Sequence, residues 1–585
     1  MIYQIYRAIT NTHKLLACSI FFTLCLLTPI AVGLAGTILP AFHYLPALGS
    51  YHFDLKPWEQ LFSSPELLGS IKLTLVSGLL ATFISFFLAF TTVAILYQSR
   101  WFTSIKHTLS PILAIPHAAI AIGLVFLLSP SGWLVRLISP WLTGYERPPT
   151  WVSVQDPYGL SLVIALVIKE TPFLLFVIFA YLPQLKPASL VRVGESMGYP
   201  ASMTWRKVIL PALYPIIRFP LLIVLAFSLT VVDLALVIGP NSPSTLAVTL
   251  FHWFTDVDLD MKFTASAGAV LLMLIIVFSA LLWEAAYQIF ISFDRKRWAS
   301  GKRTDLLSLS IFRFGAYLYL VSMLLAILSL LVLPIWAFTH RWRFPDILPS
   351  SLSVQNIKKA GPLLFDLACT SVVIAIISTL VSVIVSLVLL EQKRCKTNST
   401  KWFERLIYFP MLLPQVGFLF GIQVFLIWSN VSGSILAVIA LHTLYVLPYV
   451  YLTLSGPYLS FNQQYYVQAV CLTHCPFTSY IKVKLAMLKP VLWSAFALGV
   501  AVSFSQYLPT LAAGEGRINT LTTEAIALAA SGDRKKVGSM AMLQALFPLF
   551  AFILAQWLPY SWTRYRLALK QYSFKIWLLN TFTKR

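Results

Sequence analysis

Long apolar stretches recur along the whole chain, and a stretch of about 20 mostly apolar residues can cross the hydrocarbon core of a bilayer as one helix. Twelve spans are predicted in the 585 residues. They lie near 15–39, 68–97, 107–128, 160–183, 213–236 and 264–293, then near 314–338, 366–391, 406–428, 434–456, 490–512 and 541–560. A backbone in lipid must satisfy its own hydrogen bonds, so we predict an all-α transmembrane protein of about twelve helices in two six-helix halves.

The charged residues agree with a membrane location. They make up 11% of the chain, whereas a soluble domain has about 25%. The net charge of +22 could indicate a nucleic-acid partner, but the cations lie in short loops between apolar stretches and form no continuous basic face. With a cytoplasmic N-terminus, the inside loops hold cations in excess by roughly two to one. We therefore expect a multi-pass protein of the bacterial inner membrane with both termini in the cytoplasm, and no nucleic acid.

The sequence contains no recognisable motif for catalysis or metal binding. Six cysteines are too few for a disulfide framework in a chain of this length, and no His or Cys pair has metal-ligand spacing. Gly301-Lys302 lacks the upstream glycine of a phosphate-binding loop, and there is no nucleophile elbow. We expect a transport subunit without its own ATPase, metal or cofactor, and not an enzyme.

The two halves of the chain repeat each other. Pro116 and Gly123 recur with identical spacing as Pro414 and Gly421, at an offset of 298 residues. Further matches occur at an offset of 275, pairing Ser228, Gly239, Thr245 and Leu246 with Ser503, Gly514, Thr520 and Leu521. We predict a duplication into 1–300 and 301–585 with equal orientation, which favours a substrate path between the repeats near the midplane.

Two loops on the predicted cytoplasmic side carry the most specific motif, and they are defined here as the coupling segments 186–212 and 460–488. The motif consists of Glu-Ala-Ala, three residues, a glycine, nine residues, an apolar residue, one residue, and Leu-Pro. The first segment has Arg192, Val193 and Gly194 in place of Glu-Ala-Ala, and matches at Gly198, Val208, Leu210 and Pro211. The second has Val467, Gln468 and Ala469, then Thr473 at the glycine position, and matches at Val483 and Leu485, with Ala486 in place of the proline.

This motif resembles the EAA loop of binding-protein-dependent type I (MetI-like) ABC importer permeases. The order of spans resembles the fused, double-length permeases of ferric-iron and thiamine importers, in particular the YnjC-like branch. The segments Ile115-Pro116-His117 and Pro130-Ser-Gly-Trp-Leu134 support this resemblance. It implies the type I permease fold, alternating access, a periplasmic solute-binding protein, and two cytoplasmic ABC ATPase subunits on the two coupling segments. It also implies a small solute such as thiamine, ferric iron or a polyamine.

The coupling segments have a simple physical interpretation. Gly198 frees the backbone for a turn between two short helices, and Pro211 can begin the next helix, where its missing N–H costs little. The resulting compact helix would project from the membrane and dock on a partner. The alternative is an ordinary basic loop that only fixes the topology.

Polar residues within spans are candidates for the translocation path, because an ionisable group in a membrane is costly. Asp233 would line the path, or else lie near the membrane interface at the end of its helix. Lys169 and Glu170 precede a helix break predicted at Thr171-Pro172, and would belong to a structural polar network or a water-filled cavity. His117 and Gln415 occupy equivalent positions directly after a proline and would face a central pore, or else form interhelical hydrogen bonds.

One alternative is an ion-coupled secondary transporter, which also commonly has twelve spans and parallel repeats. Such a carrier needs no paired cytoplasmic loops and relies on buried carboxylates, so Asp233 is the residue that favours it. A scaffold or a membrane-embedded enzyme would show partner binding without substrate, or turnover without ATP.

Overall fold

A computed structural model describes residues 12–97, 99–100, 112–298, 303, 306–395, 406–530 and 532–582. Within this part of the chain, ten helices are long and apolar enough to cross a membrane, and a bent helix pair at 476–504 would make an eleventh. The remaining predicted span corresponds to the shorter apolar helix Gln415–Trp428. The prediction of an all-α membrane protein is therefore confirmed. The predicted domain boundary at 300/301 lies outside the described residues.

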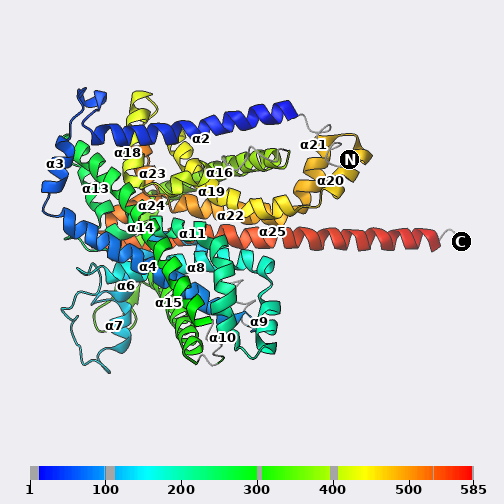
Figure 1. The fold of residues 1–585 in the computed structure, drawn as a ribbon, viewed down its shortest axis with the longest axis horizontal. Coiled ribbons are helices and arrows are strands. Elements are labelled where there is room, and N and C mark those ends of the chain that lie inside the picture. Colours follow the sequence, from blue (N-terminus) through cyan, green and yellow to red (C-terminus); the bar gives the residue numbers. More distant parts are fainter. Residues whose placement is uncertain are drawn as a thin grey trace.

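The first half is helical almost throughout (Figure 1). Its elements are α2 (Thr12–Ala41), η1 (Pro46–Leu48), α3 (Lys56–Ser63), α4 (Leu67–Leu96), α6 (His117–Leu128), α7 (Trp133–Ile138), α8 (Leu160–Leu185), α9 (Pro187–Ser196), α10 (Ala201–Thr204), η2 (Trp205–Ile209), α11 (Leu210–Thr230), α12 (Asp233–Ile238), α13 (Leu246–Phe254) and α14 (Met261–Trp298). Asp156 caps the start of α8. It accepts hydrogen bonds from the N–H groups of Leu160 and Ser161 and from the Ser161 hydroxyl. Burial works against the charged form of Asp156, but these hydrogen bonds outweigh it, so the pKa of Asp156 lies below its ordinary value.

The second half repeats this order and adds one short hairpin. Its elements are α15 (Leu306–Phe338), β1 (Thr339–Arg341), β2 (Ser351–Leu352), α16 (Gln355–Cys395), η3 (Phe409–Met411), α18 (Gln415–Trp428), α19 (Ile435–Ser460), α20 (Gln463–Thr473), α21 (Pro476–Ser479), η4 (Tyr480–Leu485), α22 (Lys489–Phe504), α23 (Leu508–Gly514), α24 (Leu521–Ala529) and α25 (Arg534–Phe582). The strands pair antiparallel, with Thr339 opposite Leu352 and Arg341 opposite Ser351.

The repeat predicted from the sequence is visible in matched caps and contacts. α6 begins directly after Pro116 and α18 directly after Pro414, as the matched prolines predict. The N–H of Leu246 donates to Thr74 Oγ1 at 2.8 Å, and the N–H of Leu521 donates to Ser371 Oγ at 3.0 Å. Both bonds satisfy an orphan donor at the start of a short helix, α13 or α24, from a long neighbouring helix.

The first helix of each half packs against the other half. α2 packs against α18 and α16, and α15 packs against α4 and α6. The matched glycines in α6 and α18 allow helices of the two halves to pack this closely. A Cβ atom on Gly123 would lie 2.2 Å from the carbonyl oxygen of Ser329 in α15, and one on Gly421 would lie 2.2 Å from that of Gly33 in α2. Small residues at such crossings let helix backbones approach closely in membranes.

Two predicted helix features are corrected. The break expected at Thr171-Pro172 is wrong, because α8 continues through Pro172 to Leu185. Pro172 leaves the carbonyl of Ile168 without its usual N–H partner, and membrane helices tolerate such a proline because neighbouring groups and local adjustments can satisfy the freed backbone. The span predicted at 213–236 instead ends at Thr230, and a new helix begins at Asp233.

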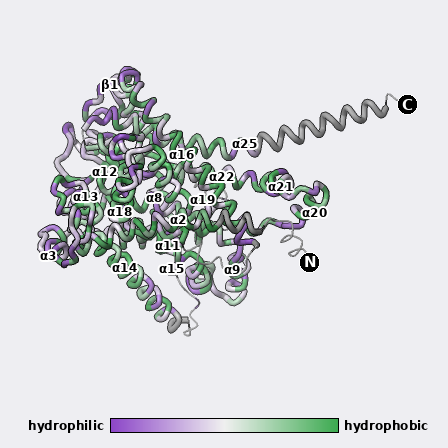
Figure 2. The backbone as a smooth tube through the Cα atoms, turned by 90° about the horizontal axis from the view of Figure 1, so that it is seen from above, coloured by the Kyte–Doolittle hydropathy of each residue, from purple (hydrophilic) through white to green (hydrophobic). Residues whose placement is uncertain are grey.

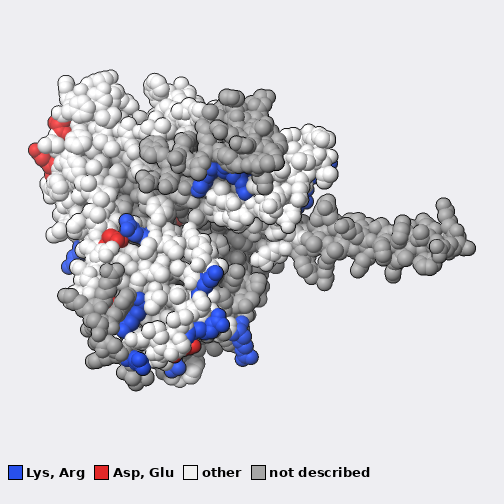
Figure 3. Space-filling model, turned by 45° about the vertical axis from the view of Figure 1, so that its right-hand side comes forward, with Lys and Arg blue, Asp and Glu red and all other residues white. Residues whose placement is uncertain are grey.

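The surface is mostly uncharged, as a lipid-facing surface requires. One face shows only small patches of Lys, Arg, Asp and Glu (Figure 3). Exposed large apolar side chains run along the long helices, for example Phe278 and Leu281 in α14. Hydrophilic segments gather at the end of the molecule that holds α3 and β1 (Figure 2).

The close crossing at Gly421 predicts that a glycine-to-alanine substitution has opposite effects on stability at a crowded and at an open position. Gly421→Ala should lower the free energy of unfolding by about 1–3 kcal/mol or more, because the added methyl overpacks a backbone contact. Gly456→Ala should be neutral or stabilising by up to about 1 kcal/mol, since alanine favours a helix and nothing lies within 4 Å of its Cβ. Thermal unfolding of the purified variants measures both changes. Equal shifts would contradict the close crossing.

Candidate functional site

The first coupling segment folds into two short helices joined by a tight turn. α9 ends at Ser196, Gly198 adopts a left-handed conformation with φ 82°, and α10 begins at Ala201. η2 then leads directly into α11, with Pro211 in its first turn. The predicted role of Gly198 in a turn is therefore confirmed, whereas Pro211 lies inside a helical span that runs on from α10 through η2 into α11.

The second coupling segment has the same design with one change. α20 ends at Thr473, and the left-handed residue is His474, with φ 50°. Only two residues separate α20 from α21, whereas four separate α9 from α10, so the left-handed residue falls one position after Thr473. Thr473 instead closes the turn through its hydroxyl, which lies 2.6 Å from Ser479 Oγ and donates to the Ala469 carbonyl.

The two segments lie at the end of the molecule opposite α3 and α13 (Figure 1), and each exposes apolar side chains. Val193 and Met197 in the first segment are each 58% exposed. Leu472 and Phe477 in the second are 83% and 72% exposed. The other matched residues divide between surface and core. Arg192, Val208 and Gln468 are exposed, Leu210 and Ala469 are buried, and Gly194, Pro211, Val467, Val483 and Leu485 lie between.

The first segment is held to the spans mainly by an aromatic contact. Trp205 is buried and packs edge-on against Phe90 and Tyr97, with ring centroids 6.0 and 5.8 Å away. Arg206 adds polar contacts to the end of α14 and the start of α15, with Nη2 at 3.6 Å from Asp294 Oδ1 and Nη1 donating to Ser308.

The second segment is held by a buried ion pair. Lys484 in η4 is fully buried, and its Nζ lies 2.5 Å from Glu391 Oε2 at the end of α16. The Tyr458 hydroxyl also donates to Glu391, and the ring of Tyr458 lies 4.3 Å from the ammonium. At the 275-residue offset, Ile209 stands where the second half has Lys484. The two halves thus hold equivalent coupling segments against the spans by different interactions.

We predict that this ion pair is essential for the stability of the second joint. Lys484→Met should cost about 3–5 kcal/mol of unfolding free energy, because it leaves the Glu391 carboxylate buried and unpaired. Adding Glu391→Gln should recover part of that loss. Lys536→Met is the matched control, since its exposed pair with Asp533 should contribute at most about 1 kcal/mol. Thermal unfolding measures each variant, and a double variant as unstable as the two losses summed would refute the pairing.

A cavity of about 260 Å³ lies where the two halves meet and contains all three predicted path residues, His117, Asp233 and Gln415. Its first-half wall comes from the start of α6, from α8 and from the α11–α12 break. Its second-half wall comes from the start of α18, from α19, α22 and α25, and from the break after α22. The helix starts after Pro116 and Pro414 and the breaks after α11 and α22 therefore meet at one place.

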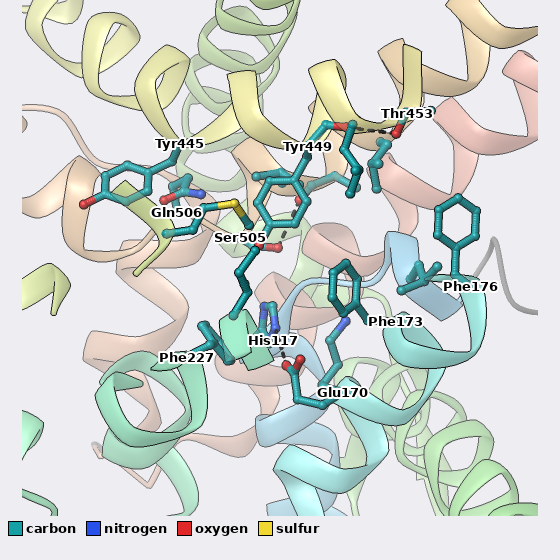
Figure 4. Close-up of a pocket in the computed structure, with 18 of the residues that line it drawn as sticks. His117, Glu170, Phe173, Phe176, Phe227, Tyr445, Tyr449, Thr453, Ser505 and Gln506 are labelled. Carbon is teal, nitrogen blue, oxygen red and sulfur yellow. Dashed lines mark hydrogen bonds and ion pairs between the residues drawn. The ribbon is translucent and has the colours of Figure 1, made fainter. Parts of the chain in front are cut away.

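Lys169 and Glu170 also line this cavity, beside the three residues predicted for the path. Lys169 donates to the carbonyl of Ile115, at 2.5 Å, just before the break that precedes α6. Glu170 Oε1 lies 3.8 Å from Nε2 of His117, and the two side chains point toward each other (Figure 4).

The second half supplies uncharged polar groups that the sequence did not single out. Tyr445, Tyr449, Thr453, Ser505 and Gln506 face the first-half residues across the cavity (Figure 4). The repeat could have indicated one of these residues, because the 275-residue offset pairs Tyr445 with Glu170. Among the described residues, no group of three or more His, Cys, Asp or Glu side chains could hold a metal ion.

Comparisons with known proteins agree with this geometry. The family described as binding-protein-dependent transport system inner membrane component matches residues 101–288, which include the first coupling segment and all ionisable cavity residues. The chain is 29% identical over 525 residues to the inner membrane ABC transporter permease protein YnjC of Escherichia coli (strain K12), covering 88% of this chain and 92% of that protein. The chain is therefore similar to binding-protein-dependent ABC transporter permeases along most of its length. No solved structure gives a significant match.

This permease is thus a double-length, multi-pass protein of the inner membrane. This similarity implies partners of two kinds, an ABC ATPase and a solute-binding protein. The coupling segments and the cavity are the two parts of the permease that these partners and a solute would use.

Proposed function

We propose that the permease forms the translocation path of an ATP-driven importer, with the cavity as the path and one ATPase subunit on each coupling segment. The observation that carries this proposal is the pair of equivalent helix–turn–helix segments at one end of the molecule, each with exposed apolar side chains. A solute-binding protein would dock at the opposite end. The coupling segments and both termini would then be cytoplasmic.

Each coupling segment is connected to the cavity by helices that follow it directly in the chain. In the first half, 201–230 forms one continuous helical span from α10 through η2 to α11, and its far part lines the cavity with Ile223 and Phe227. In the second half, the corresponding pair of helices is bent by 77° before α22 reaches the cavity. Closure of two ATPase subunits on ATP would move both segments together and tilt α11 and α22.

The substrate would be a small solute, of the size that a cavity of about 260 Å³ can hold. The resemblance seen in the sequence favours thiamine, ferric iron or a polyamine. For the solute to drive the cycle, the inward-open and outward-open states must differ in their affinity for it.

The second candidate is an ion-coupled secondary transporter of twelve spans. Asp233 and Glu170 in the cavity favour it, because such carriers couple through buried carboxylates. It gives no role to the exposed apolar residues of the coupling segments.

Co-purification with an ATPase tests the proposal. The tagged permease is co-expressed with candidate ABC ATPase subunits, and the bound ATPase is measured after solubilisation. Met197→Asp and Leu472→Asp should each reduce ATPase binding at least about tenfold, since each buries a charge in an apolar contact. Val257→Asp is the control, because Val257 is 95% exposed between α13 and α14, at the other end of the molecule.

The outcomes separate the two candidates. Loss of ATPase from both coupling variants, with normal binding to the Val257→Asp protein, supports the importer. If ATPase binds all three proteins equally, the segments only fix topology. Uptake driven by an ion gradient and abolished by Asp233→Asn would then identify a secondary transporter.

A further inference from the structure

The charges of the cavity are unevenly divided between the halves. All four of its His, Lys, Asp and Glu side chains come from the first half, namely His117, Lys169, Glu170 and Asp233. At the same offsets that relate the two halves, the second half has Gln415, Leu444, Tyr445 and Leu508, all uncharged. One wall of the cavity is therefore ionic and the other is neutral.

The ionic wall holds more negative than positive charge. Lys169 interacts with both carboxylates, Glu170 and Asp233, so one ammonium faces two acidic groups. A protonated His117 would place a second cation close to Lys169, which is bound to the carbonyl two residues before that histidine. Because a second buried cation is costly, we count the imidazole as neutral. With Lys169 charged and both carboxylates ionised, the cavity then has one negative charge in excess.

We propose that the cavity selects a small organic solute with one net positive charge, which replaces the missing countercharge of Glu170 and Asp233. This inference rests on the proposed function, since it assigns a substrate class to the same path. An excess charge in a low-dielectric site is unfavourable until it is paired, so a cation gains affinity that a neutral or anionic solute of equal shape does not.

The walls around the carboxylates suit the apolar body of such a cation. Phe173 and Phe227 from the first half and Tyr449 from the second are half-buried and line the cavity. Figure 4 shows Phe173 and Tyr449 on opposite sides of the space above Glu170. A cation next to aromatic faces gains further attraction from the negative charge of the rings.

Charge-selective thiol labelling tests this proposal without any partner protein. The six native cysteines are replaced, and a single reporter is introduced as Ser505→Cys or as Ser494→Cys, both on the neutral wall. Membranes with the full chain are treated at pH 8 with a trimethylammonium or a sulfonate methanethiosulfonate reagent. We expect the cationic reagent to react faster at both reporters, relative to a free thiol.

Removing one carboxylate should remove that preference. Asp233→Asn should lower the ratio of cationic to anionic labelling by about five- to tenfold, and Lys169→Met should raise it. Asp258→Asn is the matched control, with the same change of charge at an exposed site near the far end of the molecule. Benzyltrimethylammonium should slow labelling of Ser505→Cys, whereas benzyl alcohol and benzoate should not.

Several results would overturn the proposal. These are faster labelling by the anionic reagent, a ratio that Asp233→Asn leaves unchanged, or reporters that react with neither reagent. Because labelling needs no ATPase, such a result leaves the coupling experiment intact. A failed coupling experiment likewise leaves the cation preference measurable, so the two failures are distinguishable.

Discussion

The close crossing of helices at Gly123 and Gly421 is the contact on which the rest of the permease depends. At each crossing the first helix of one half lies against the other half, backbone against backbone. Lipid provides little hydrophobic force between helices, so their association relies on close packing. These two crossings join the halves, and the cavity lies between the surfaces that they bring together. A side chain larger than hydrogen at either glycine would separate α6 from α15 or α18 from α2.

The two halves share one arrangement of helices but use different side-chain interactions at equivalent positions. Trp205 fixes the first coupling segment by aromatic packing, whereas Lys484 and Glu391 fix the second by a buried ion pair. Likewise the first half places all the charges in the cavity and the second places hydroxyls and amides there. Fusion into one chain permits this, because each half always meets the other and never a copy of itself.

The coupling segments share a helix irregularity that would suit the proposed coupling to an ATPase. Both contain a π-helical turn, η2 directly before α11 and η4 three residues before α22, the helices that lead to the cavity. A π-turn widens the helix and often marks a functional site. Here it lies at the joint between the part that would grip an ATPase and the part that would move the path.

Much of the fold followed from the sequence alone, because lipid imposes local rules. Length and hydropathy determined the spans, although α6 and α18 begin only after Pro116 and Pro414, inside the predicted spans. Gly198 correctly marked the turn in the first coupling segment. Other predictions failed where local rules compete. Pro172 did not break α8, and the left-handed residue of the second turn was His474, because Asn, Asp and His tolerate that conformation more readily than most side chains.

Only the tertiary structure decided which distant residues meet. Lys484 and Glu391 are 93 residues apart, and nothing in either local sequence indicates the other. Lys169, Glu170 and Asp233 were recognisable as costly residues in spans, but their common cavity depends on how α8, α11 and α12 pack. The sequence determined which segments enter the membrane, since that depends on the transfer of each segment from water to lipid. The packing of helices against one another decided the path, since it depends on shape at the crossings.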